Sequence, residues 1–369
     1  MAEQKEKERR IGRVVVKEFR DYPDPDAWMS EKDVDEIAEI FQTPLTGHYN
    51  WDYAVADDRL NRLYQLAKKR QWDVEIDLDW DIPYDARIGT LKDYDLGHQQ
   101  MIGYEPYQQL TEEQQLDFQK KLSAWTVGQF LHGEQGALMV ASQLCTAAPT
   151  YNAKLYAATQ TYDEARHVEA FNKYIQVRQG IMPPVGKDLK HLLDTILTDE
   201  RWDLKFIGMQ VIIEGLALSA FRTFQQVHPD PLMRQMLDYI IKDEARHVTF
   251  GINYLEQYVK TLPQEEIEER ARFAYEACVV MKTRLHATGV YEHFGFDVED
   301  TCKYISKAPT RDTFQTFLFQ RIIPNLKKVG LLTESVRPDF EKLGLLKWED
   351  LPDDGDIDWK EMEKPLKES

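Results

Sequence analysis

Cysteine is scarce in this sequence, which has only three among its 369 residues: Cys145, Cys278 and Cys302. They lie far apart and form no CxxC pair, which excludes a disulfide framework and a zinc site made of thiolates. The sequence also lacks a run of about 20 apolar residues, and it begins with the charged stretch MAEQKEKERR. We therefore expect neither a membrane span nor a secretory signal, and we predict a protein of the reducing cytoplasm.

Basic residues are outnumbered, because 46 Lys and Arg stand against 64 Asp and Glu, a net charge of −18. Nucleic acids and anionic membrane surfaces attract Lys and Arg, so neither is expected as the main partner. Hydrophobic residues still make up 43% of the chain, which is enough for a folded core. Helical periodicity dominates and β-branched runs between tight turns are nearly absent, so the expected fold class is all-α.

Four long helices are predicted in the middle of the chain. Thr111 and Gln114 form a capping box that opens the first, while Pro149 and Pro229 stand where helices must break. The predicted helices cover about 111–146, 151–178, 199–227 and 230–260. Two further apolar-periodic segments are expected at about 264–288 and 311–329, ending at Gly289 and Gly330.

These signals divide the chain into four parts. The central part, 111–262, is the four-helix bundle, and an N-terminal wrapping segment, 1–110, precedes it. Additional helices in 263–345 are expected to pack on the bundle. The last part, 346–369, is rich in charge and is predicted to be a C-terminal arm.

An internal repeat carries the chemistry. The stretch DEARHV at 163–168 recurs unchanged at 243–248, and Glu134 and Glu214 upstream of it are also 80 residues apart. Each half therefore reads Glu-x29-Glu-x2-His. Pro149 and Pro229 lie midway between the two glutamates of their halves, so each glutamate is about 22 Å of helix from the break. Two helices folded at the proline would bring the paired glutamates level.

A bundle built in this way would gather four carboxylates and two imidazoles at one height. Within the helix, Glu and His at i and i+3 project from one face. Burying four unpaired carboxylates among apolar residues is very unfavourable unless cations neutralise them. Oxygen-rich ligation with one imidazole per metal suits iron or manganese better than zinc. A single Glu-x-x-His is usually a solvated helix face, but two matched copies with their upstream glutamates predict a dinuclear metal site.

At these residues the chain resembles the ferritin-like di-iron carboxylate superfamily, in particular its oxygen-activating enzymes. These include hydroxylase subunits of bacterial multicomponent monooxygenases, acyl-carrier desaturases and the ribonucleotide reductase small subunit. The resemblance covers about residues 112–260 and implies a ferritin-like bundle with additional N- and C-terminal helices. It also implies two iron ions, with manganese or a mixed Mn/Fe pair as alternatives. One iron would be bound by Glu134, Glu164 and His167, and the other by Glu214, Glu244 and His247, with Glu164 and Glu244 bridging.

The resemblance further implies roles for the residues around the ligands. Asp163 and Asp243 would accept the free ring N–H of the opposite histidines. Arg166 and Arg246 would complete this network. Ala137, Phe171, Ala217 and Leu218 lie one turn from the ligands and are predicted to line an apolar substrate pocket.

Three positions depart from individual branches of the superfamily. The radical-bearing Tyr of the reductase subunit would fall at Phe171. The additional His ligand of the p-aminobenzoate N-oxygenase branch would fall at Ile240, and the Thr common in hydroxylases and desaturases at Leu218. The sequence therefore predicts an outlying oxidase or oxygenase and no clear membership of a named branch.

The expected function is activation of O2 to oxidise a small organic substrate by hydroxylation, N-oxygenation or desaturation. Electrons would come from a reductase or ferredoxin, and a homodimer is a possible assembly. A ferroxidase of the ferritin type and a radical-generating subunit remain alternatives, as does a metal-free bundle. The chain is about 220 residues longer than its bundle, which argues against a storage shell.

Overall fold

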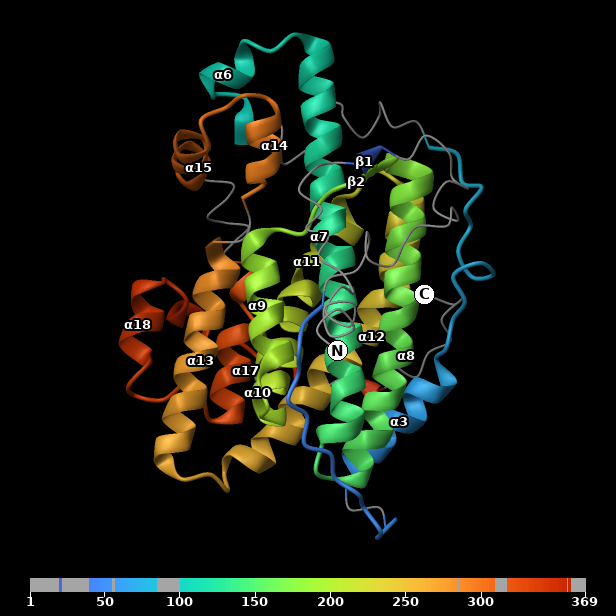
Figure 1. The fold of residues 1–369 in the computed structure, drawn as a ribbon, viewed down its shortest axis with the longest axis vertical. Coiled ribbons are helices and arrows are strands. Elements are labelled where there is room, and N and C mark those ends of the chain that lie inside the picture. The colour runs from blue at the N-terminus through green and yellow to red at the C-terminus, as the bar shows by residue number, and fades with distance from the viewer. Residues whose placement is uncertain are drawn as a thin grey trace, which may run out of the picture.

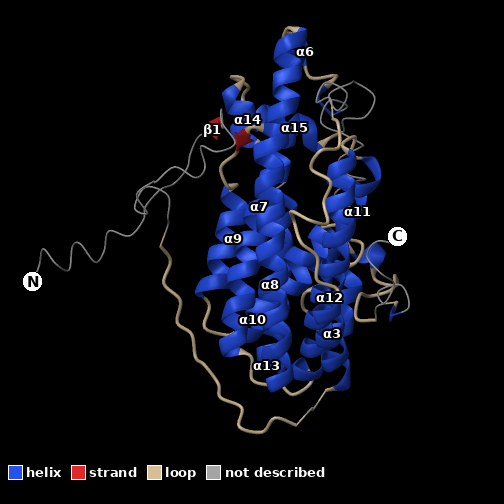
Figure 2. Ribbon diagram, turned by 90° about the vertical axis from the view of Figure 1, so that its right-hand side faces the viewer, coloured by secondary structure: helices blue, strands red, loops and turns tan. Residues whose placement is uncertain are grey.

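The computed structural model describes residues 20–21, 40–54, 57–84, 100–283, 286–308, 317–356 and 358–359. In these residues the regular secondary structure is almost entirely helical (Figures 1 and 2), which confirms the all-α prediction. The only sheet in the described residues is one antiparallel pair of two-residue strands, β1 (Arg20–Asp21) and β2 (Ile181–Met182). The fold is thus set by helix packing.

The centre of the protein is a bundle of four long helical rods (Figure 1). The first pair is α7 (Glu112–Ala147) packed along α8 (Tyr151–Tyr174). The second pair is α11 (Glu214–Val227) packed along α12 (Pro231–Val259). The predicted capping box of Thr111 and Gln114 opens α7. Each pair folds back at the predicted proline, because these residues cannot continue a helix.

The third rod is composite. It begins as α10 (Trp202–Phe206), continues as the π-helical segment η3 (Ile207–Ile213) and ends as α11. Among the described residues this rod, Trp202–Val227, is the one helix long and apolar enough to cross a membrane. However, 94% of its apolar 18-residue stretch is buried inside the protein. It is therefore the core helix of the bundle. A second π-helical segment, η2 (Ile175–Gln179), extends α8 to Gly180, whose φ of 64° ends it.

Other helices cover the bundle. α3 (Asp58–Lys69) packs on α8 and α12 and buries Leu60, Leu63, Leu66 and Ala67. α13 (Gln264–Thr283) packs on η3 and α9 (Lys187–Thr198), and α17 (Ile322–Val329) packs on α12. The remaining short helices are α6 (Glu105–Gln108), α14 (Thr288–His293), α15 (Val298–Ser306), α18 (Arg337–Lys342) and the 3-10 turn η4 (Leu346–Trp348). α6, α14 and α15 gather at one end of α7 (Figure 1).

Several predicted boundaries need correction. Gly289 does not end a helix but lies inside α14, because the preceding helix already stops at Thr283. α9 was not predicted, although its buried leucines follow helical spacing. The segment 311–329 is interrupted by a turn at residues 320–321, and residues 309–316 lie outside the described part. Part of the wrapping segment, 85–99, also lies outside it.

The described part of the predicted C-terminal arm packs against the bundle. Thr249 donates a hydrogen bond to the backbone oxygen of Asp354, and the Asn253 amide donates one to that of Gly355. The Asn325 side chain and Asp354 also bind each other through two hydrogen bonds. Polar groups of α12 and α17 hold this segment, so up to residue 356 it is part of the folded body.

Candidate metal centre

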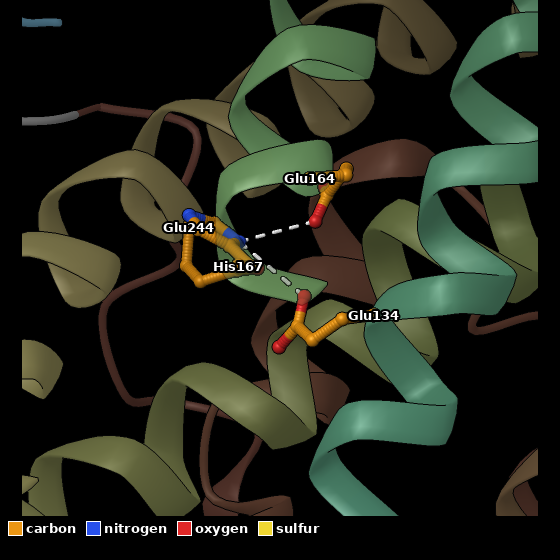
Figure 3. Close-up of side chains that lie close together, drawn as sticks. All are labelled: Glu134, Glu164, His167 and Glu244. Atoms are coloured by element: carbon orange, nitrogen blue, oxygen red, sulfur yellow. Dashed lines mark hydrogen bonds and ion pairs between the residues drawn. The ribbon is translucent and has the colours of Figure 1, made fainter. Parts of the chain in front are cut away.

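All six predicted ligands meet in the middle of the bundle. Glu134 comes from α7, Glu164 and His167 from α8, Glu214 from the first turn of α11, and Glu244 and His247 from α12. None of these residues exceeds 5% exposure. Figure 3 shows four of them pointing toward one another. Because each helix pair folds back at its proline, the two glutamates of that pair lie at the same height in the bundle, as the spacing predicted.

The six side chains form two overlapping groups that could each hold a metal ion. The first consists of Glu134, Glu164, His167 and Glu244, and the second of Glu164, Glu214 and His247; within each group the ligand atoms lie within 4.8 Å of one another. Glu164 belongs to both groups, as expected for a bridging ligand. Glu244 lies 3.1 Å from His167 Nδ1 and 3.8 Å from His247 Nδ1, between the two histidines.

A buried network of two aspartates and two arginines stands behind the histidines. His167 Nε2 lies 3.2 Å from Asp243 Oδ2, and His247 Nε2 lies 3.2 Å from Asp163 Oδ2. Arg166 and Arg246 each bind both aspartates. An ionised carboxylate only accepts, so each Nε2 carries the proton and donates it.

This cross-pairing decides which ring nitrogen faces the centre. With Nε2 bound to the aspartate, Nδ1 of His167 points at carboxylate oxygens of Glu134 (3.3 Å) and Glu164 (3.1 Å). His247 Nδ1 lies 3.0 Å from Glu164 in the same way. At such distances a cation must lie between the ring nitrogen and the carboxylates: a proton on Nδ1 in the metal-free protein, and a metal ion in its place when metal binds. The network therefore prepares both histidines to bind metal through Nδ1.

The electrostatics of the cluster also require cations. Burial, reinforced by neighbouring carboxylates, raises the pKa of Glu134 and of Glu214 well above the usual range. Burial alone would lower the pKa of His167, but its bonds to Asp243, Glu134 and Glu164 outweigh this and raise it well above normal. Glu214 Oε2 and both Glu244 oxygens are buried without a hydrogen bond. Such orphaned oxygens, in a donor set of carboxylates and imidazoles, fit divalent metal ions.

The structure adds two residues that sequence reasoning missed. Gln160, one turn before Glu164 on α8, donates from its amide to Glu214 (2.8 Å) and to Glu164 (3.2 Å). Gln160 stands four residues before Glu164 and therefore on the same face of the helix, which is the signal by which the sequence could have shown it. Trp72 donates from its indole to Asp243 at 2.7 Å. No pattern in the sequence links Trp72 to the repeat, because its position depends on how the N-terminal segment wraps the bundle.

A pocket lies against the centre, on the side of α7 and α11. It is lined by Gln129, Phe130, Gly133, Glu134, Ala137, Ile213, Glu214, Ala217, Phe221 and Glu244. Ala137 and Ala217 thus lie where they were predicted. Phe171 and Leu218 do not line it. Phe171 packs behind the pocket wall, with its ring centroid 5.7 Å from that of Phe221, and Leu218 is buried in the core on another face of its helix.

The chain is similar to one described protein family and to several solved structures. Residues 54–330 match the family described as p-aminobenzoate N-oxygenase AurF. Among solved structures, a variant of R2-like ligand-binding oxidase with an anaerobically reconstituted Mn/Fe cofactor is 20% identical, with a TM-score of 0.46 over 74% of this chain and 93% of that chain. R2-like ligand-binding oxidase with an aerobically reconstituted metal cofactor after photoconversion is 17% identical, with a TM-score of 0.47 over the same shares. No curated protein matches.

The family match corrects one expectation. Membership of a named branch was not predicted, because Ile240 replaces the additional histidine ligand of the N-oxygenase branch. Ile240 is fully buried in an apolar cluster, so this position offers the centre no ligand atom. The match nevertheless covers three quarters of the chain, well beyond the bundle. The chain therefore belongs to the p-aminobenzoate N-oxygenase AurF family, and it is an O2-dependent oxygenase that oxidises a small organic substrate at a dinuclear carboxylate–histidine site.

Proposed function

We propose that the centre binds two iron ions and that the enzyme oxidises the nitrogen of a small organic amine. The observation that carries the proposal is the set of buried carboxylate oxygens facing the Nδ1 atoms of two histidines whose Nε2 atoms the aspartates hold in place. Glu134, His167 and Glu244 would hold one ion, Glu214 and His247 the other, and Glu164 both. The family name supports nitrogen as the atom oxidised.

The protein's own groups have separate tasks in this reaction. The bound iron pair supplies the redox chemistry by which O2 is activated. Gln160 holds the carboxylates of Glu214 and Glu164 in orientation, and Asp163 and Asp243 hold the histidine rings. The apolar wall of Phe130, Ala217 and Phe221 excludes water and places the substrate beside the ligands. Electrons would come from a separate reductase or ferredoxin, and the enzyme would work in the cytoplasm.

A single-turnover experiment tests the function. The protein is loaded with Fe(II) without oxygen, given a chemical reductant and aniline, and then exposed to O2. We expect about two iron ions per chain, as six ligands in two groups imply, and an N-oxygenated product by liquid chromatography and mass spectrometry. Protein loaded with Mn(II) alone serves as the metal control. Uptake of many iron ions per chain into a mineral, without amine oxidation, would contradict the proposal and favour iron storage.

Metal affinity should rise with pH. The pKa values of Glu134, Glu214, His167 and His247 are raised, so in the metal-free protein these groups keep their protons to higher pH than usual. A metal ion must displace these protons, so binding releases them and is favoured as pH increases. For each proton released, the apparent affinity for the metal ion rises on the order of tenfold per pH unit. Calorimetry of Fe(II) or Mn(II) binding at pH 6 and pH 8 measures this slope, and a pH-independent affinity would contradict it.

A further inference from the structure

The pocket beside the centre contains no positive side chain. Among the residues that the structure describes, those lining it are apolar except for the three glutamates and Gln129. Gln129 has both ends of its amide engaged, because it donates to the backbone oxygen of Pro184 (3.0 Å) and accepts from the backbone N–H of Gly186 (2.6 Å). The described lining therefore offers an anionic group no positive counter-charge, only the second amide N–H of Gln129.

The charge of the centre does not compensate for this lack. Four glutamates balance two divalent ions, so the occupied centre has no excess positive charge for a substrate anion. A carboxylate that entered the pocket would lose its hydration without gaining a counter-charge, which is strongly unfavourable. An uncharged ring would instead gain from contact with Phe130 and Phe221, whose centroids lie 5.0 Å apart.

Gly133 leaves open space on its side of the pocket. It lies inside α7 and lines the pocket, and a Cβ atom added to it would meet nothing within 4 Å. The other two glycines near it on α7 are different, because an added Cβ would collide with Pro183 at Gly128 and with Leu193 at Gly136. A glycine inside a helix makes that helix less stable than an alanine at the same position would. Packing explains glycine at 128 and 136, whereas the half-buried Gly133 faces the open space of the pocket.

We propose that the pocket takes an uncharged, apolar substrate, in the space that the missing side chain of Gly133 leaves open. This inference rests on the proposed function only in treating the pocket as the substrate site. It makes Gly133 a residue that determines specificity. It also separates this chain's substrate from p-aminobenzoate, which carries a carboxylate.

Two ligands that differ only in that carboxylate test the charge preference. Aniline and p-aminobenzoate are titrated by calorimetry into metal-loaded protein held without oxygen. We expect aniline to bind at least about tenfold more tightly, since the carboxylate loses hydration without a partner. Equal or tighter binding of p-aminobenzoate would overturn the proposal. A complementary pair, Gln129→Lys and Gln129→Met, loses the same loop contacts, and only the lysine variant should gain affinity for p-aminobenzoate.

Substitution of Gly133 tests whether the substrate occupies the open space beside this residue. Gly133→Val should weaken aniline binding at least about tenfold while metal content stays at the wild-type value. Gly289→Val is the matched control, because an added Cβ at Gly289 in α14 also meets nothing within 4 Å and that helix contributes nothing to the pocket. Gly133→Ala, which helix propensity favours, should raise Tm by roughly 1–2 °C and weaken binding of 1-naphthylamine more than that of aniline. Wild-type affinities in both Gly133 variants would overturn the proposal.

These binding measurements separate the inference from the function. Suppose that no amine is oxidised, but aniline binds more tightly than p-aminobenzoate and the Gly133 variants bind aniline more weakly. The proposed reaction is then wrong and the pocket assignment stands. If amines are oxidised but p-aminobenzoate binds best, the reaction stands and the inference is wrong.

Discussion

Glu164→Gln is expected to abolish binding of both metal ions and to reduce amine oxidation at least about a thousandfold. Glu164 is the one ligand shared by the two groups, so its loss weakens both at once. Bound metal stabilises the folded state, and an ion at a thousand times its Kd contributes about 4 kcal/mol. The wild-type protein should therefore show a large rise in Tm when Fe(II) or Mn(II) is added, and the variant almost none. Metal analysis, product yield and Tm measure the three effects.

Two further variants make this prediction specific. Glu214 belongs to one group only, so Glu214→Gln should keep about one metal ion per chain where Glu164→Gln keeps none. Glu169→Gln is the matched control, since Glu169 lies on the same helix and is exposed. It should behave like the wild type. Two metal ions in Glu164→Gln, or equal losses in the Glu164 and Glu214 variants, would show that Glu164 does not bridge.

Asp243→Asn is expected to destabilise the metal-free protein by about 3–5 kcal/mol, as removal of one partner from a buried ion pair does. Asp243 is fully buried and binds Arg166, Arg246 and His167 as well as the indole of Trp72. Burial would raise the pKa of Asp243, but Arg246, His167 and Arg166 overcome this and hold it far below the usual range. A neutral amide would leave the two buried guanidinium groups to share the single charge of Asp163. Urea unfolding of metal-free protein measures the loss.

The same substitution should also weaken metal binding about 10- to 100-fold, because His167 loses the acceptor that fixes its ring. Asp199→Asn is the control, since Asp199 pairs with Arg201 at 2.8 Å where both side chains are partly exposed. Such pairs contribute at most about 1 kcal/mol. Unchanged stability and metal affinity in Asp243→Asn would show that the aspartate–arginine network neither stabilises the core nor positions the histidine.

The repeat made the ligand set predictable from the sequence. Helical periodicity, the two prolines and the equal spacing of Glu134, Glu164, Glu214 and Glu244 depend only on local geometry: 1.5 Å of rise per residue and a break where proline removes a hydrogen bond. The acceptor roles of Asp163 and Asp243 followed from the resemblance and from the need of a ligand histidine for a fixed tautomer. Each of these inferences requires only neighbours along one helix or a symmetric pair of helices.

Residues brought in from outside the repeat were not predictable in this way. Trp72 reaches Asp243 across 171 positions of sequence, and the C-terminal segment reaches α12 across about a hundred. The lining of the pocket was only half predicted for a related reason. Ala137, Ala217, Phe171 and Leu218 all lie about one turn from a ligand, but the relative rotation of the packed helices turns only the two alanines toward the cavity.

The scarcity of cysteine and the doubled Glu-x29-Glu-x2-His pattern determined, before any coordinates, that this is a helical protein with a carboxylate–histidine centre and no thiolate site. Tertiary packing alone decided that Nδ1 of each histidine faces the centre. It also decided that the described lining of the pocket has no positive side chain and that Gly133 faces open space there. The physical reason is that ligand spacing is a property of one helix, whereas the direction of a ring nitrogen and the shape of a cavity depend on every helix packed around them.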